Sequence, residues 1–254
     1  MLRHSVQMTC TERVEEPGLA GGRLQNVRDI GGRGLRPGVL YRSDAPREGD
    51  APPDLAPWPP RTVVDLRSEE EIGPRHPLTG PDTDIVWEEL AVDASLAHML
   101  EDEDTAPDDL GVLYLQMLRT TAPALVRIVR LIATRPPPVL VHCAAGKDRT
   151  GLAIAVALSA VGVPREQVVE DYARTQANMP GVLERISTDP RMPGGPDAIE
   201  RVRVERPQLL DAPAAAMEAA LDELDDADGA AEWLLRNGLS DAELSALRER
   251  LLVA

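Results

Sequence analysis

Cys143 and Arg149 lie six positions apart in the segment VLVHCAAGKDRTG, which spans Val139 to Gly151. A cysteine thiolate is a nucleophile, and the planar guanidinium of an arginine can hold two oxygens of a phosphate at once. The pair could therefore bind a phosphoryl group and attack its phosphorus. Such an attack would give a thiophosphate intermediate that water then hydrolyses.

The flanking segments predict how this pair is positioned. Val139 to Val141 form a short apolar run that is typical of a buried strand. Residues 152–161 are almost entirely apolar and predict a buried helix, which ends at Gly162. The loop between them, Cys143 to Arg149, then presents unpaired backbone N–H groups at the positive end of a helix dipole. That environment favours a phosphate-sized dianion and the thiolate form of the cysteine.

The other residues of this loop are expected to bind the substrate. The backbone of Ala144, Ala145 and Gly146 would surround a phosphate, together with Lys147 and Thr150. Lys147 is the only lysine in the chain. Its compact ammonium could steer a second phosphate or a lipid headgroup, with chance placement as the alternative.

Two side chains in the loop have alternative interpretations. The carboxylate of Asp148 would repel a phosphate, so it is expected to turn away and brace Arg28 or Lys147, or else to act as a second acid. The hydroxyl of Thr150 would either donate to the sulfur of Cys143, which eases departure of the thiolate, or simply mark the start of the helix.

Asp65 is the first candidate for the general acid that protonates the leaving oxygen. It lies in residues 62–67, which predict a strand, and open α/β sheets gather functional groups at the carboxyl ends of their strands. A salt bridge to Arg67 is the structural alternative. Asp108 and Asp109, in an acidic run before the next predicted helix, are reserve candidates.

Four segments of the sequence resemble one known group of enzymes. HCAAGKDRTG, at 142–151, resembles the signature loop of the cysteine-dependent protein tyrosine phosphatase superfamily, and its GKDRTG part resembles the atypical bacterial branch of tyrosine and phosphoinositide phosphatases. NVRDIGG at 26–32 is similar to the same branch, as are YRSD at 41–44 and VVDLRS at 63–68.

The resemblance implies an α/β fold of three layers, in which helices flank a central, mainly parallel sheet. It implies that Asp65 is the acid and that His142, Arg28 and Asp29 support the active site. A simple ion pair between Arg28 and Asp29 is the alternative. The Trp-Pro-Asp acid loop of the animal enzymes is missing, because two prolines follow Trp58. The identity of the acid therefore stays open at this point.

The chain divides into three predicted parts. Residues 1–20 predict a flexible tail, residues 21–180 a phosphatase core, and residues 181–254 a helical extension that packs on the core within one domain, as a lid or a wall. We expect a helix to break at Met179 to Gly181 and a long mobile loop at 187–199.

Composition limits the partners. The 254 residues carry a net charge of -16, which argues against nucleic acid or an anionic membrane as a bulk partner. The sequence contains neither an apolar run of roughly 20 residues, which a bilayer crossing needs, nor a signal-like block. A cytoplasmic location is predicted, with unconventional export left open. The two cysteines give no disulfide framework and no metal spacing, so no metal or other cofactor is expected.

We therefore expect a phosphoric monoester hydrolase that acts on phosphorylated protein or phosphoinositide. A rhodanese-like sulfurtransferase and a non-catalytic phospho-binding module are the alternatives. A P-loop NTPase is excluded, because its motif requires glycine at position 141 and serine or threonine at 148, where this chain has Val141 and Asp148. The choice among phosphotyrosine, phosphoserine or phosphothreonine and phosphoinositide stays open, as does the oligomeric state.

Overall fold

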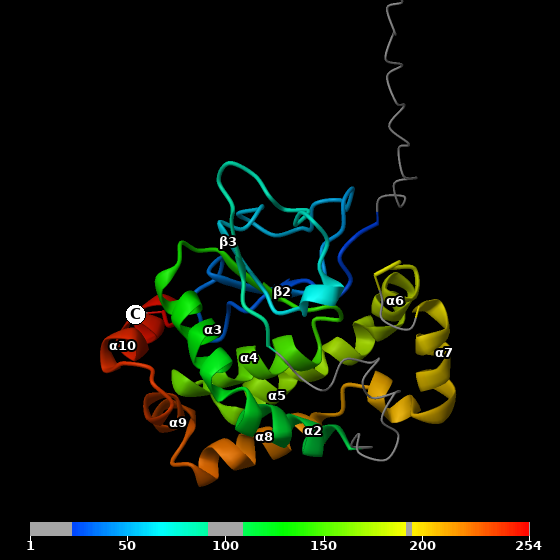
Figure 1. The fold of residues 1–254 in the computed structure, drawn as a ribbon. Coiled ribbons are helices and arrows are strands. Elements are labelled where there is room, and N and C mark those ends of the chain that lie inside the picture. The colour runs from blue at the N-terminus through cyan, green and yellow to red at the C-terminus, as the bar shows by residue number, and fades with distance from the viewer. Residues whose placement is uncertain (1–21, 91–108, 192–194, 254) are drawn as a thin grey trace, which may run out of the picture.

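The computed structural model describes residues 22–90, 109–191 and 195–253, and Figure 1 shows their arrangement. The predicted tail, residues 1–20, lies outside the described residues, and so does the reserve acid Asp108.

A five-stranded sheet forms the centre of the fold. The strands lie in the order β1 (Arg28–Asp29), β2 (Leu40–Ser43), β5 (Val139–His142), β3 (Thr62–Asp65) and β4 (Asp84–Trp87). Only β1 runs antiparallel to its neighbour. The predicted signature strand β5 therefore occupies the middle of the sheet, and its last residue, His142, pairs in register with Ser43 on one side and Asp65 on the other. The signature loop therefore begins at the carboxyl end of the middle strand.

The two faces of the sheet bury different side chains, because neighbouring residues of a strand point to opposite faces. Val139 and Val141 join the main core, whereas Leu140 points the other way into a small cluster with Tyr41 and Val63. Residues of the loops between the strands complete this small cluster. In the described part of the chain, helices cover the main-core face (Figure 1).

Four helices surround β5 in the sequence. They are α2 (Leu110–Thr120), α3 (Ala122–Thr134), α4 (Asp148–Ala160) and α5 (Arg165–Ala173). Every residue of α4 from Thr150 to Leu158 is buried, as its apolar sequence predicts. Burial all round holds the helix firmly, so the signature loop is fixed between a central strand and a central helix.

The C-terminal part of the chain completes the helical layer. It contains α6 (Thr175–Ser187), α7 (Gly195–Glu205), the short 3-10 helix η2 (Pro207–Leu210), α8 (Ala214–Asp226), α9 (Ala230–Arg236) and α10 (Asp241–Leu251). Helix α8 packs on α2, α9 on α4 and α10 on α3. A capping box of Ser240 and Glu243 starts α10. None of the helices in the described ranges combines the length and apolar character that a bilayer crossing requires.

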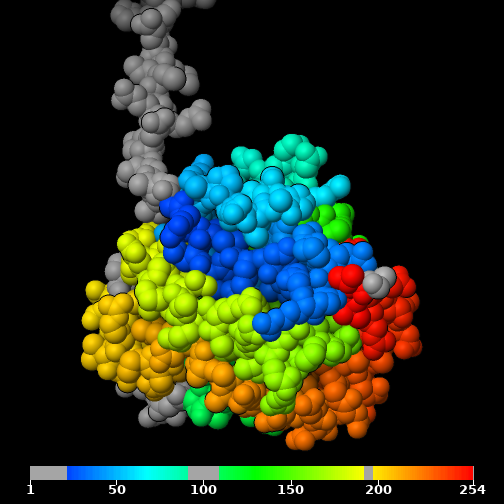
Figure 2. Space-filling view, turned by 180° about the vertical axis from the view of Figure 1, so that it is seen from behind, coloured from blue at the N-terminus to red at the C-terminus, as the bar shows by residue number. Residues whose placement is uncertain are grey.

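Two predictions about this region are wrong. Helix α6 continues through Met179, Pro180 and Gly181, and the break falls at Arg174 instead. Pro180 removes one backbone hydrogen bond, but burial of Met179 and Val182 holds the helix together. Helix α7 begins at Gly195, inside the range predicted as a long loop. Seen from behind, the segment after residue 22 lies against α5 and α6 (Figure 2).

The predicted fold class is confirmed: the protein has a mainly parallel sheet, helices packed against it and a C-terminal helical extension.

Candidate active site

The signature loop turns sharply between β5 and α4. Gly146 has a φ of 65°, and a Cβ atom at this position would lie 2.2 Å from the carbonyl oxygen of Ser43. Only glycine avoids both the unfavourable backbone angle and this clash. The loop can therefore pass directly against the end of β2.

The carbonyl groups of the loop are held on its outer side. Ala144 accepts a hydrogen bond from the amide of Ala45 at 3.0 Å. Gly146 accepts from the side chains of Asn26, at 2.9 Å, and Arg42, at 2.6 Å. The sequence pointed to the motifs that contain Asn26 and Arg42, but it did not identify these two residues as contacts of the loop.

The N–H groups of the loop consequently point to its inner side, because the C=O and the N–H of one planar trans peptide unit point in opposite directions. In the described part of the chain, the N–H groups of residues 144–147 donate no hydrogen bond to the protein. Ala144, Ala145 and Gly146 thus form the kind of backbone cradle that the sequence predicts for a phosphate.

Arg149 lies in the first turn of α4, and a carboxylate fixes its orientation. Its Nη1 and Nη2 atoms donate to Glu71 at 2.6 and 2.7 Å. Burial opposes the charged form, but Glu71, Cys143 and Asp148 together raise the pKa of Arg149 above its ordinary value. The guanidinium is therefore permanently charged, and it interacts electrostatically with the cysteine that the spacing predicts as its partner.

The position of Glu71 is set by its own short helix. Glu71 ends the 3-10 helix η1 (Glu69–Glu71), and the backbone and hydroxyl of Ser68 donate to its carboxylate at 2.9 and 3.1 Å. Although burial disfavours its ionisation, Arg149 and Ser68 lower the pKa of Glu71. The Ser68–Glu71 spacing is a capping box, a signal in the sequence that could have indicated this residue.

Cys143 lies at the base of the loop and is 2% exposed. Thr150 is fully buried, and its hydroxyl has no hydrogen-bond partner among the described residues. The expected donation from Thr150 to the cysteine sulfur is thus absent from this structure. Its role in the second step stays a prediction.

Asp148 is the one aspartate of the loop, and a tyrosine anchors it. The hydroxyl of Tyr114 donates to its Oδ1 atom at 2.8 Å, and the hydroxyl of Tyr172 lies 2.7 Å from that of Tyr114. The ammonium of Lys147 is 3.4 Å from the same carboxylate oxygen. Of the two expected brace partners, Asp148 therefore lies beside Lys147 and not beside Arg28.

Lys147 connects the loop to the C-terminal extension. It is 3% exposed, and its ammonium donates to the backbone carbonyls of Leu209, at 2.5 Å, and Asp211, at 2.9 Å. These bonds use two of its three donors on fixed backbone groups. Its predicted role in substrate binding stays a prediction.

Arg28 does not pair with Asp29, which accepts instead from two glycine amides near its own turn. Arg28 donates to Asp171 at 2.7 Å and to the Oδ1 atom of Asn26 at 2.6 Å. Arg42 donates to the same Asp171 at 2.6 Å. Burial and the neighbouring Arg42 lower the pKa of Arg28 to about 10. Arg28, Arg42 and Asp171, which we call the loop cluster, support the signature loop from its outer side.

Asp65 forms a salt bridge with Arg67, which was the structural alternative to its role as the general acid. Its carboxylate is buried and accepts from Arg67 at 2.9 and 2.7 Å. Burial opposes ionisation, but His142 and Arg67 outweigh it and hold the pKa of Asp65 below its usual range. The reserve acid Asp109 caps α2 by accepting from the amide of Gly111 at 2.6 Å.

Asp65, His76 and His142 are the one group in the described ranges with the atoms for a metal site. The amide of Leu78 donates to Nδ1 of His76, which places the proton of that ring on Nε2. This Nε2 is 3.0 Å from Nε2 of His142, whose Nδ1 faces the carbonyl of Cys143 at 3.3 Å. The two rings are thus neutral and use their Nε2 atoms on each other, so the set does not fit a metal ion.

Burial keeps this histidine pair neutral. It lowers the pKa of His76 to about 3 and that of His142 to about 4, although Asp65 acts in the opposite direction on both. His142, which the resemblance placed beside the active site, therefore supports Cys143 through the backbone.

Comparisons with known proteins agree with this geometry. The profile of a family described as the tyrosine phosphatase family matches residues 20–253. A triple specificity protein phosphatase of Mycobacterium tuberculosis, PtpB, is 34% identical over 195 residues, which are 64% of this chain and 70% of the relative. A tyrosine-protein phosphatase of Nostoc commune is 32% identical over 112 residues, which are 43% of this chain and 38% of that relative. The predicted resemblance and the predicted reaction class, hydrolysis of phosphoric monoesters, are confirmed, and this chain belongs to the tyrosine phosphatase family.

Proposed function

We propose that this protein removes phosphate from phosphotyrosine in proteins, with activity toward phosphoserine and phosphothreonine as well, through a cysteinyl-phosphate intermediate on Cys143. One observation carries the proposal. The loop from Cys143 to Arg149 has its carbonyls tied outward and its amides free, with the sulfur at one end and a charged guanidinium at the other. This arrangement matches the charge and shape of a phosphate dianion.

Substrate binding would use the backbone amides of residues 144–147 and the guanidinium of Arg149. Glu71 restricts the rotation of Arg149, so less conformational entropy is lost when the phosphate binds. The dianion then lies in line with the thiolate of Cys143. The same groups stabilise the charge on the equatorial oxygens during transfer.

We assign the general acid to Asp148. Tyr114 anchors one of its oxygens, and the side chain is 28% exposed. In the first step the sulfur bonds to phosphorus, the ester P–O bond breaks, and the leaving oxygen takes the proton of Asp148. In the second step Asp148 accepts a proton from the attacking water, phosphate is released and the thiolate of Cys143 is restored. Asp65 suits this role less well, because Arg67 keeps it ionised.

We place phosphoproteins before phosphoinositides as substrates. The case for a lipid headgroup depended on the ammonium of Lys147, which donates to two backbone carbonyls here. The names of the relatives, a triple specificity protein phosphatase and a tyrosine-protein phosphatase, also favour phosphoproteins. The cytoplasmic location and the exclusion of nucleic acid stay predictions from composition. No observation favours the sulfurtransferase or the binding-module alternative.

Turnover of p-nitrophenyl phosphate and of phosphopeptides tests this proposal. Cys143→Ser should still bind a phosphopeptide but lose hydrolysis by several decades, because the nucleophile is gone. Arg149→Lys should lower kcat/KM on the order of 100-fold, because a single ammonium cannot reproduce the two-pronged grip.

A matched control for the arginine exchange is Arg119→Lys. Arg119 is exposed on α2, and its one partner among the described residues is Glu223, so this variant should keep the wild-type rate. Full activity of Cys143→Ser, or an undiminished rate of Arg149→Lys, would overturn the proposal.

A further inference from the structure

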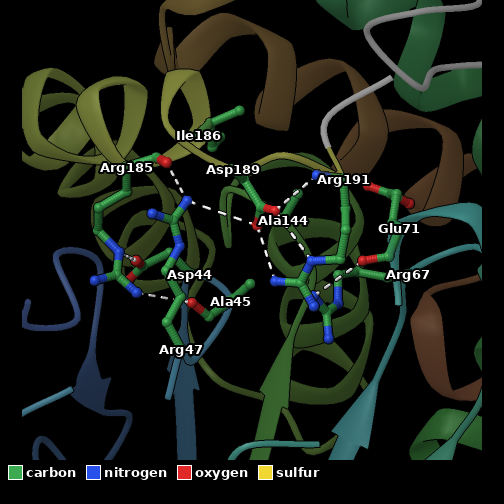
Figure 3. A pocket seen from close by; sticks show the side chains of 10 residues that line it. All are labelled: Asp44, Ala45, Arg47, Arg67, Glu71, Ala144, Arg185, Ile186, Asp189 and Arg191. Atoms are coloured by element: carbon green, nitrogen blue, oxygen red, sulfur yellow. Dashed lines mark hydrogen bonds and ion pairs between the residues drawn. The ribbon is translucent and has the colours of Figure 1, made fainter. Parts of the chain in front are cut away.

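A cleft rich in arginine lies directly beside the signature loop (Figure 3). Ala144, the residue after the cysteine, lines it, and so does Glu71, which holds Arg149. A substrate whose phosphate occupies the signature loop can therefore extend into this cleft. The cleft also contains four arginines, at positions 47, 67, 185 and 191.

Two of the four arginines are committed to the fold. Arg67 is buried and makes two hydrogen bonds to Asp65. Arg185 makes two hydrogen bonds to Asp50, at 2.8 Å each, and its Nε atom lies 2.8 Å from Asp44. Each of these guanidiniums is paired with a buried aspartate, Asp65 or Asp44, so neither is available to a ligand without a large cost.

The other two arginines share a single carboxylate. Arg191 donates to Asp189 through Nε and Nη2, both at 3.0 Å. Nη2 of Arg47 lies 3.7 Å from the same carboxylate, which is too long for a hydrogen bond. Nε of Arg47 is buried and has no hydrogen-bond partner among the described residues. We call Arg47, Arg191 and Asp189 the cleft cluster; it carries one positive charge more than its single acid neutralises.

The carboxylate of Asp189 accepts hydrogen bonds from one neighbouring residue in the described ranges. In the described ranges its hydrogen bonds come from the backbone and side chain of Arg191, two residues further on, and Arg47 adds a charge contact. Burial opposes ionisation of Asp189, but its bonds to Arg191 outweigh this and lower its pKa. A rotation of this one side chain would free the guanidinium of Arg191 for another anion, next to the charge of Arg47, whose Nη1 and Nη2 atoms donate to the hydroxyl of Thr188 and the carbonyl of Arg185.

We propose that Arg47 and Arg191 form a second anion subsite for an acidic side chain of the phosphopeptide substrate, and that Asp189 occupies the subsite when no such side chain is bound. This inference rests on the proposed protein phosphatase activity. Asp189 itself shows that a carboxylate on a polypeptide fits between the two arginines. The net charge of -16 disfavours approach to an anionic lipid surface, so a peptide is the occupant that we expect.

The test compares pairs of phosphotyrosine peptides that differ only by glutamate or glutamine at one position, scanned on either side of the phosphotyrosine. The measured quantity is the ratio of kcat/KM for the glutamate peptide to that for the glutamine peptide. At the best position the wild-type ratio should be about fivefold, and Arg47→Ala and Arg191→Ala should each bring it toward one.

Asp189→Asn should raise the same ratio, because the internal competitor loses its charge while the two arginines remain. A misfolded variant could not produce this increase. Arg119→Ala removes an exposed arginine on α2, far from the cleft in the fold, and should leave both the ratio and the basal rate at their wild-type values.

Three outcomes would overturn the subsite. One is a wild-type ratio near one at every position, and another is a ratio that none of the cleft variants changes. The third is a loss confined to soluble phosphoinositide bisphosphates relative to monophosphates, which would assign the cleft to a lipid headgroup. If wild-type protein hydrolysed no phosphate ester at all, the proposed function itself would fail, and the two failures are thereby distinguished.

Discussion

The loop cluster and the cleft cluster have the same composition, two arginines around one aspartate, but the first contacts the carbonyl of Gly146 and the second lines the cleft beside Ala144. In the loop cluster, Arg42 is fully buried and its second donor reaches the carbonyl of Gly146. In the cleft cluster, Arg191 is 31% exposed at its side chain, while Nη1 and Nη2 of Arg47 donate to the hydroxyl of Thr188 and the carbonyl of Arg185. The exposure of the arginines separates the two roles: the first cluster supports the backbone of the loop, and in the second Arg191 can be reached by a ligand.

The largest effect on the free energy of unfolding should come from replacing the aspartate that the two arginines of a cluster share, Asp171 in the loop cluster or Asp189 in the cleft cluster. Asp171→Asn leaves Arg28 and Arg42 buried without a counter-charge and should lower the free energy of unfolding by about 3 to 5 kcal/mol. Asp189→Asn should cost about 1 kcal/mol, because Arg191, which makes its hydrogen bonds, is nearer to solvent. Urea unfolding of the two variants measures the difference. Equal losses would contradict the comparison.

A second test asks whether the loop cluster acts through Gly146. Gly146→Ala forces a Cβ atom against the backbone of Ser43 and should cost about 2 to 4 kcal/mol, with loss of turnover. Gly162→Ala is the matched control, because Gly162 also has a positive φ, of 83°, but has open space around it. It should cost about 1 kcal/mol and leave turnover intact. If both variants behaved alike, contact with β2 would not be what fixes the loop.

Lowering the pH should reduce the free energy of unfolding through the histidine pair, His76 and His142, and not through the loop cluster or the cleft cluster. His76 and His142 have a lower pKa in the folded protein than in the unfolded chain, so the unfolded chain binds more protons as the pH falls below about 6.5. Their neutral burial is fully favourable above that pH. The free energy of unfolding should then fall by up to about 1.4 kcal/mol per pH unit for each ring, down to about pH 4.

Asp171 and Asp189 both have a lowered pKa, so they stay ionised through most of this pH window. Asp189→Asn should therefore keep the acid sensitivity, whereas His76→Asn should reduce it. A stability that does not change between pH 7 and pH 5 would show that the two rings are not buried as neutral groups.

The smallest expected change in the stability of these variants comes from added salt. Raising NaCl from about 0.05 M to about 0.5 M should shrink the stability difference between wild type and Asp189→Asn by a few tenths of a kcal/mol, because solvent ions screen exposed pairs. The difference for Asp171→Asn should hardly move. The reverse order would mean that the cleft is the better shielded of the two sites.

Local patterns in the sequence predicted the fold and the signature loop well. The apolar run before Cys143 and the apolar segment after Arg149 form a central strand and a buried helix, because their neighbours in space are apolar as well. Asp65 and Arg67 pair as their spacing allows, since side chains two apart in an extended segment share a face. Arg28 and Asp29, one apart in β1, point to opposite faces, which is why their expected pairing is wrong.

The supporting contacts of the loop could not be predicted in this way. Arg28 and Arg42 meet Asp171 across 143 and 129 positions of sequence, and Tyr114 meets Asp148 across 34. No helical or strand period links such distant residues; the fold alone brings them together. Pro180 likewise reads as a helix breaker unless the burial of its neighbours is known.

The two hydrogen bonds from Lys147 to Leu209 and Asp211 have a consequence for the shortest working form of the protein. A chain that ended at residue 180 would leave the ammonium of Lys147 without these two carbonyl partners, in a cavity beside the signature loop that water would fill. Any truncated version that still turns over substrate should therefore reach at least Asp211. In a series of variants shortened from the C-terminus one helix at a time, turnover should fall abruptly once Asp211 is lost, and not decline gradually.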